Sequence, residues 1–190
     1  PLTLIQAVAQ LAESRPSVKL FFMGTAHPHP GVPEMPIIKK ARELAAELGV
    51  SGTHVFFNDS WVDYDERQNY LLEADIGVST HRSHIETTFS FRTRILDYLW
   101  ASLPMVVTEG DHFADLVEKH GLGITVPAAE TQALVDALEQ ALFDTEFRSS
   151  ATQALAVVRA SYRWSEVLKP LVSHVEGLAG GTIPPKASRI

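Results

Sequence analysis

Five short apolar segments alternate with segments of helical periodicity, and this alternation restricts the fold more than any other feature of the sequence. The apolar segments are residues 18–24, 54–58, 76–80, 105–108 and 123–126. Apolar residues recur at helical spacing between and after them, near residues 36–48, 64–74, 92–102, 111–120 and 130–143. Buried strands that alternate with helices are typical of a parallel sheet covered on both faces. The sequence therefore predicts an α/β domain with a doubly wound parallel sheet.

The two ends of the chain give further predictions. Apolar residues at helical spacing follow Pro1, which suits a first helical turn, so a helix is expected to open the chain as part of a longer protein. After Glu146 the pattern is helical to about Leu178, with breaks expected near Tyr162 and at Pro170. Gly and Pro pairs then predict a linker or disordered tail. We expect one domain over residues 1–176 and a tail over residues 177–190.

Composition excludes several classes of function. The formal net charge of −7 argues against broad binding to nucleic acid, although a local basic pocket remains compatible with it. The chain has no cysteine, which excludes disulfides and thiol nucleophiles and fits a reducing compartment such as the cytoplasm. No apolar run reaches the length of about 18 residues that a membrane span needs.

Three connections are expected to meet at one edge of the sheet. They are residues 25–36, 59–63 and 81–91, and each follows a predicted strand. Ligands of open α/β sheets bind at the carboxyl ends of the strands. The sequence therefore places the candidate site at this edge.

The helix predicted over residues 92–102 offers an anion site at its start. Its first amides are unpaired and lie at the positive end of the helix dipole, and Arg92 and Thr93 add a guanidinium and a hydroxyl. Asp97 lies just beside the apolar stripe of this helix, about one turn after Thr93. A ligand with both a phosphate and a sugar would suit this pair.

Simpler interpretations of the same residues stay open. Arg94 and Asp97 could form a surface ion pair of small energetic effect, and a Ser or Thr before the helix could be a cap. Histidine pairs in two of the loops could suggest a metal site, but loop histidines without acidic neighbours are more often solvated, and we predict no metal. These residues are His27, His29, His81 and His84.

Four segments together resemble the C-terminal, donor-binding half of GT-B glycosyltransferases of the group 1 (family 4) type, in one bacterial subgroup. They read GTAHPHPGVPEM, WVDYDERQNYLLEADIGVS, HIETTFSFRTRILDYLWASLP and TEGD, and the resemblance covers roughly residues 2–176. The third segment is the most specific. The resemblance implies a Rossmann-like domain whose first strand would precede Pro1.

The resemblance also implies roles for individual residues. Residues 101–104 match the family's A-x-G-x-P turn with Ser102 in place of Gly, so Asp97 falls on the second acid of the E-x7-E motif, which holds the nucleotide ribose. Phe89 falls on the first acid, and Glu86 is expected to supply that carboxylate. Arg92 falls on a glycine and is expected to contact the diphosphate. The predicted donor-binding residues are Gly24, Thr25, Glu86, Ser90, Phe91, Arg92, Thr93 and Asp97.

The implied activity is retaining transfer of a sugar from a nucleotide-diphosphate sugar, without a separate cofactor or metal. The acceptor, a glycan or a lipid-linked sugar, would be held by an N-terminal half that these residues lack, and the helices from about Trp164 would pack on that half. We therefore assign no catalytic residue and expect residues 1–190 alone to be inactive. A cytoplasmic location is expected, and peripheral membrane association of the intact protein is compatible with the acceptor.

Two other functions are alternatives for this sequence. A sugar-nucleotide epimerase of GT-B architecture would use the same diphosphate site. A non-catalytic α/β regulatory or interaction module is the second. A receiver domain of that kind needs an acidic cluster at its first strands, and the segments 18–24 and 54–58 carry none.

Overall fold

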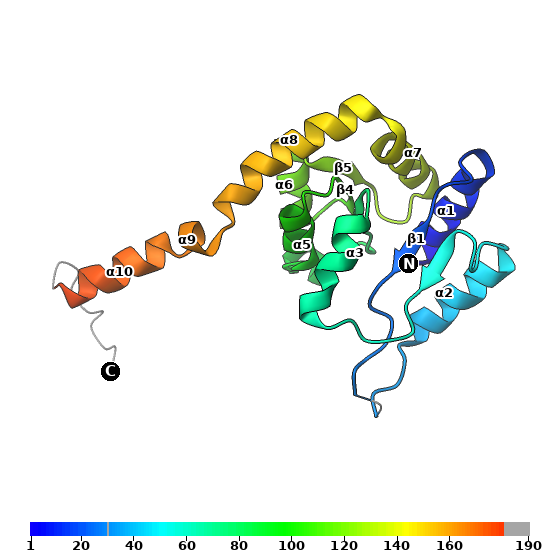
Figure 1. Cartoon of the computed structure of the whole chain (residues 1–190), viewed down its shortest axis with the longest axis horizontal. Coiled ribbons are helices and arrows are strands. Elements are labelled where there is room, and N and C mark those ends of the chain that lie inside the picture. Colours follow the sequence, from blue (N-terminus) through cyan, green and yellow to red (C-terminus); the bar gives the residue numbers. More distant parts are fainter. Residues whose placement is uncertain (30, 181–190) are drawn as a thin grey trace.

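The structure is a computed structural model that describes residues 1–29 and 31–180. Its elements follow the predicted alternation of helices and strands (Figure 1). The strands are β1 (Leu20–Phe22), β2 (Val55–Phe57), β3 (Gly77–Ser79), β4 (Met105–Thr108) and β5 (Gly123–Val126). The helices are α1 (Leu2–Ser14), α2 (Pro36–Glu47), η1 (Tyr64–Glu66, a 3₁₀ turn), α3 (Arg67–Glu73), α4 (Ile85–Phe89), α5 (Arg94–Ala101), α6 (His112–His120), α7 (Thr131–Phe143), α8 (Thr145–Ser161), α9 (Trp164–Val167) and α10 (Lys169–Ala179).

The strands form two parallel groups in the described residues. β1 pairs with β2, and β4 pairs with β3 on one side and β5 on the other. Phe21 lies opposite Phe56, and Val106 lies between Val78 and Ile124. Because parallel strands have their carboxyl ends at the same edge, the loops after β3 and β4 emerge side by side.

Strand β4 shows why the chain needs helices on both faces of the sheet. Val106 points into a core formed with α1, α2 and α7, whereas Met105 and Val107 point into a second core formed with α5, α6 and α8. All three side chains are buried. Side chains alternate across a strand, so a continuously apolar strand has to be covered twice. The prediction of a doubly wound α/β fold is confirmed.

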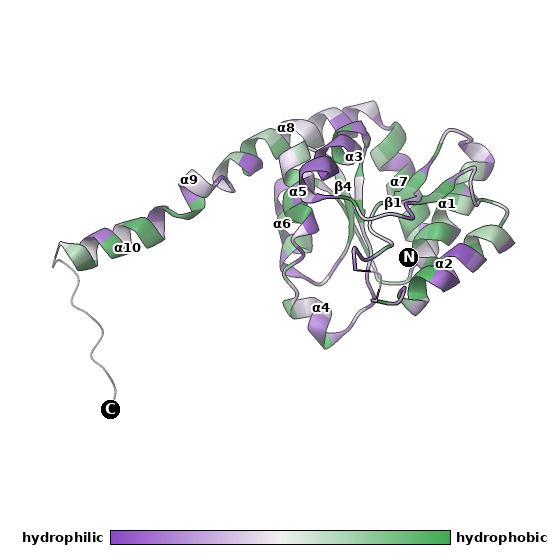
Figure 2. Ribbon diagram, turned by 60° about the horizontal axis from the view of Figure 1, so that its bottom comes forward, coloured by the Kyte–Doolittle hydropathy of each residue, from purple (hydrophilic) through white to green (hydrophobic). Residues whose placement is uncertain are grey.

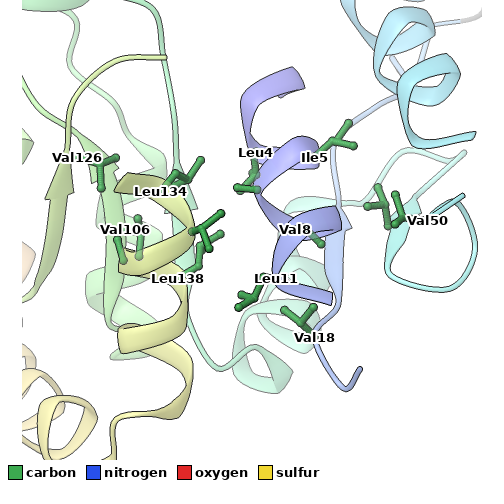
Figure 3. Close-up of a cluster of buried hydrophobic side chains, with 14 of the residues drawn as sticks. Leu4, Ile5, Val8, Leu11, Val18, Val50, Val106, Val126, Leu134 and Leu138 are labelled. Atoms are coloured by element: carbon green, nitrogen blue, oxygen red, sulfur yellow. The ribbon is translucent and has the colours of Figure 1, made fainter. Parts of the chain in front are cut away.

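The first core joins the two groups of strands through the packing of α1 against α7. Figure 3 shows Leu4 and Leu11 of α1 on the side that faces Leu134 and Leu138 of α7. These four leucines are each at most 5% exposed. Burying a leucine side chain contributes about 1.5–3 kcal/mol, so this contact is a major stabilising element of the domain.

The C-terminal helices extend away from the rest of the molecule (Figures 1 and 2). The break predicted near Tyr162 is confirmed, since α8 ends at Ser161 and α9 begins at Trp164. The break predicted at Pro170 is wrong by two residues. It lies at Leu168, and Pro170 sits in the first turn of α10, where a missing N–H costs no helical hydrogen bond.

The expected tail begins later than predicted, because α10 continues through Gly177 and Leu178 to Ala179. The part of the expected tail over residues 181–190 lies outside the described residues. No helix within residues 1–29 and 31–180 is both long and apolar enough to cross a membrane.

Two details of the region after β3 differ from the predictions. The expected loop over residues 81–91 contains the short helix α4, which projects from the body in Figure 2. His84 caps it, accepting from the Glu86 N–H through Nδ1. Helix α5 begins at Arg94 instead of Arg92, because the Ile95 and Leu96 amides form tight bonds to the carbonyls three residues earlier.

Candidate functional site

The carboxyl edge of the sheet is held together by hydrogen bonds between the ends of neighbouring strands. After β1 and β2, the buried Thr25 donates its hydroxyl to the Asn58 carbonyl, and Asn58 Nδ2 donates to the Met23 carbonyl at 3.2 Å. After β3 and β4, the His81 N–H donates to Thr108 Oγ1 at 3.1 Å. These bonds fix the positions at which the loops of the candidate site begin.

Asp111 directly precedes α6 and places a buried carboxylate at this edge. Its Oδ1 accepts from the Ala114 N–H at 2.8 Å and so caps α6. Its Oδ2 accepts from Arg92 Nε at 2.8 Å and lies 3.5 Å from His81 Nε2. The Asp111 side chain is only 3% exposed. One buried carboxylate therefore links the start of α6, the segment before α5 and the loop after β3.

The ring of His81 faces this carboxylate without a hydrogen bond. Its side chain is 7% exposed, Nδ1 lies 3.1 Å from the Arg82 carbonyl, and Nε2 has no hydrogen-bond partner in the described part of the chain. A carbonyl only accepts, so Nδ1 carries the proton in this contact.

The start of α5 is open, although less so than predicted. The Ile95 N–H bonds to the Arg92 carbonyl at 3.0 Å, and the Leu96 N–H bonds to the Thr93 carbonyl at 2.9 Å. Two of the four expected free amides are therefore occupied. The Thr93 and Arg94 amides have no acceptor among the described residues, and the Thr93 side chain forms no cap there. The interpretation that a Ser or Thr before this helix caps it is wrong, because α5 has no side-chain cap.

Arg92 is tethered to the edge through only one of its nitrogens. Nε donates to Asp111, whereas neither Nη group has an acceptor within residues 1–29 and 31–180. The side chain is 17% exposed. A guanidinium bonded in this way still offers donors from both amino groups, which match two oxygens of a phosphate or carboxylate.

Asp97 lies on α5 and pairs with Arg67 of α3 at 3.1 Å, in place of the surface pair with Arg94 that its spacing suggested. Arg67 also stacks over the ring of Tyr64, with 4.0 Å between its Cζ and the ring centroid. The Arg67 contact uses Asp97 Oδ2, and Oδ1 has no partner in the described residues. One oxygen of Asp97 can therefore accept from a ligand hydroxyl.

The remaining predicted residues lie on α4, in the segment before α5 and at the end of β1. Glu86 is exposed on α4, and Ser90 Oγ donates to the Glu86 carbonyl at 2.8 Å. Phe91 is 61% exposed but contacts Phe113 of α6, with 4.7 Å between ring centroids. Gly24 is exposed beside the buried Thr25, at the end of β1.

Sequence reasoning found Arg92 and Asp97 but missed the residues that hold them. An aspartate directly before a helix is a recognisable cap signal, and this signal could have identified Asp111. The contact between Asp111 and Arg92, however, joins residues 19 positions apart, so no local sequence pattern indicates it. Arg67 was missed for the same reason, and His81 was recognised only as a loop histidine, without its contact with Asp111. Among the described residues, no group of three or more His, Asp or Glu side chains could hold a metal ion.

Comparison with known proteins identifies the family. The model of the group 1 glycosyl transferases matches residues 2–144, which include all five strands and the loops at their carboxyl ends. The chain belongs to the group 1 glycosyl transferases. No curated protein matches the sequence.

Solved structures of glycosyltransferases share the fold. WaaG, a glycosyltransferase of lipopolysaccharide biosynthesis, superimposes with a TM-score of 0.60 at 22% identity over 83% of this chain. Sucrose-phosphate synthase from Thermosynechococcus elongatus gives 0.73 at 19% identity over 95% of this chain. The C-terminal domain of LpcC from Francisella tularensis gives 0.69 at 17% identity over 86% of this chain.

The extent of these matches agrees with a C-terminal GT-B domain. This group 1 glycosyl transferase chain covers 37% of WaaG and 42% of the sucrose-phosphate synthase, but 79% of the LpcC C-terminal domain. It thus corresponds in size to one domain of such an enzyme. The resemblance to the C-terminal half of group 1 GT-B glycosyltransferases is confirmed.

Proposed function

We propose that this domain binds the nucleotide-diphosphate sugar donor of a glycosyltransferase, with the diphosphate at Arg92 and at the start of α5. The observation that carries the proposal is the combination of two open amides, at Thr93 and Arg94, with a guanidinium whose Nη groups have no acceptor among the described residues. A dianion would receive donors from a helix start and from an arginine fork at once.

The chemistry of transfer requires positive potential at this point. The bond between the anomeric carbon and the β-phosphate oxygen breaks, and its electron pair leaves with the nucleoside diphosphate. The developing negative charge would be stabilised by Arg92 and the two amides, which are already oriented before the reaction. We propose that the transfer retains the configuration of the anomeric carbon and that the transferred group is a hexose.

Asp97 would hold the nucleotide ribose. Its free Oδ1 would accept from a ribose hydroxyl while Oδ2 keeps the ion pair with Arg67. Glu86, exposed on α4, would bind hydroxyls of the donor sugar. Thr25 and Gly24 would line the other side of the donor site at the end of β1. No additional cofactor or metal is needed in this proposal.

The acceptor would be a glycan or a lipid-linked sugar held by polypeptide outside residues 1–190. We therefore expect residues 1–190 alone to bind nucleotide without transferring sugar. For the intact enzyme we propose a cytoplasmic location, with peripheral association to a membrane if the acceptor is lipid-linked.

Isothermal titration with UDP and with GDP tests the proposal, comparing the wild-type chain with Arg92→Ala. Arg92→Ala removes a charge-assisted contact worth about 1.5–3 kcal/mol. It is therefore expected to weaken the affinity for whichever nucleotide binds more tightly by about 10- to 150-fold. Arg163→Ala, which removes an arginine between α8 and α9, is the matched control and should bind like the wild type. Equal affinity of wild type and Arg92→Ala would contradict the proposal.

A further inference from the structure

We infer that Asp111 is a positioning residue, which fixes Arg92 so that its two Nη groups are presented to the diphosphate. The inference rests on the proposed function, since it concerns the same anion site. Asp111 itself would not touch the ligand. It would act through Arg92, whose Nε it accepts from at 2.8 Å.

The residue type at position 111 is the first argument. Serine, threonine and asparagine cap helices about as well as aspartate does. Here, however, the side chain accepts two hydrogen bonds at once, from the Ala114 N–H through Oδ1 and from Arg92 Nε through Oδ2. Asparagine has only one acceptor oxygen, and its NH₂ group would face one of the two donors. Only a carboxylate can satisfy both the cap and the arginine without moving.

The rigidity of Asp111 is the second argument. Its side chain is 3% exposed, and one oxygen is bonded to a backbone amide of α6. Phe113, two residues further along the chain, is packed in the second core and contacts Phe91. Arg92 is therefore bonded to a carboxylate whose own position is fixed. An arginine held at Nε keeps its guanidinium plane fixed, so less conformational entropy is lost when the Nη groups bind an anion.

Simple electrostatics makes the opposite prediction, which allows a sharp test. The Asp111 carboxylate partly cancels the charge of Arg92 and repels a nearby anion. If charge alone mattered, Asp111→Asn would strengthen anion binding. If Asp111 positions Arg92, the same substitution weakens binding, and it does so only while Arg92 is present.

The experiment measures the affinity for inorganic pyrophosphate in a double-mutant cycle of wild type, Asp111→Asn, Arg92→Ala and the double variant. Asp111→Asn is expected to weaken binding about 5- to 10-fold in the wild-type background and to have no weakening effect in the Arg92→Ala background. Asp144→Asn is the matched control, because Asp144 also caps a helix, accepting from the Phe147 N–H at 3.0 Å, but lies before α8. It should leave pyrophosphate affinity unchanged.

A spectroscopic measurement separates positioning from a purely structural role. The Arg92 Nε–H proton should exchange slowly with solvent in the wild type and in Asp144→Asn, and rapidly in Asp111→Asn. Unchanged or tighter pyrophosphate binding by Asp111→Asn, or equal weakening in both backgrounds, would overturn the inference. Failure of the wild type to bind pyrophosphate, with Arg92 Nε–H still protected, would overturn the proposed function and with it the role of Asp111 in binding.

Discussion

Replacing Asp97 by asparagine separates the ribose contact from the diphosphate contact, because the two probes UDP and pyrophosphate share only the diphosphate. Asp97 pairs with Arg67 through Oδ2 at 3.1 Å, and the two side chains are 30% and 28% exposed. Pairs of this kind contribute about 0.2–1 kcal/mol to stability. The variant should therefore fold, with a free energy of unfolding lower by less than about 1 kcal/mol.

The effect on UDP follows from the free oxygen. A hydrogen bond to a charged acceptor is worth about 1.5–3 kcal/mol, and a bond to a neutral amide oxygen about 0.5–1.5 kcal/mol. Asparagine would keep the weaker bond, so the expected loss is about 1–1.5 kcal/mol, or ~5- to 12-fold in the dissociation constant for UDP. Pyrophosphate has no ribose, so its affinity should not fall.

Isothermal titration of both ligands, with urea unfolding as a measure of folding, gives the result directly. Asp136→Asn is the matched control, since it makes the same substitution on α7 and removes no contact assigned to the ribose. If Asp97→Asn lowered the affinities for UDP and pyrophosphate by the same factor, or left the affinity for UDP unchanged, the assignment of Asp97 to the ribose would be refuted.

Two further predictions concern Tyr98, whose hydroxyl donates to the Val78 carbonyl at 3.0 Å. Tyr98→Phe leaves that carbonyl without its donor, so urea unfolding should show a free energy of unfolding lower by about 0.5–1.5 kcal/mol; no change would contradict the bond. Burial, and to a lesser extent Asp97, raises the pKa of the Tyr98 phenol, against the opposing effects of Arg94 and the Val78 bond. The folded pKa is then above the unfolded one, so this stabilisation is complete below pH ~10 and is lost as the pH rises further. The difference in free energy of unfolding between wild type and Tyr98→Phe should therefore shrink above that pH. A difference that grows with pH would contradict a raised pKa of Tyr98.

The regular elements could be predicted because their signals are local. The four residues Met105–Thr108 are apolar except for the last and form a buried strand as expected, and the amphipathic pattern of residues 130–143 gives a helix within one residue of the prediction. Helix α4 was missed because five residues are too few for periodicity to show. The late start of α5 depends on two backbone bonds that no side-chain pattern reports.

The site could be predicted only in part, because its charges are paired across long stretches of sequence. The helix over residues 92–102 correctly drew attention to Arg92 and Asp97. Their partners, Asp111 and Arg67, lie 19 and 30 residues away. These contacts are created by the fold, which brings the starts of α5 and α6 to the same edge. Residue types alone suggested that the Arg92 guanidinium and the Asp97 carboxylate are free. In the structure, Arg92 Nε and Asp97 Oδ2 are each paired, whereas the Arg92 Nη groups and Asp97 Oδ1 can still bind a ligand.

The most direct test of donor binding is an amide NMR titration of the ¹⁵N-labelled chain with UDP and GDP. The account predicts that at least one nucleoside diphosphate shifts the Thr93 and Arg94 amide signals most strongly, with smaller changes at the end of β1. Saturation with both nucleotides without a shift of these two amides, or shifts confined to α9 and α10, would contradict it.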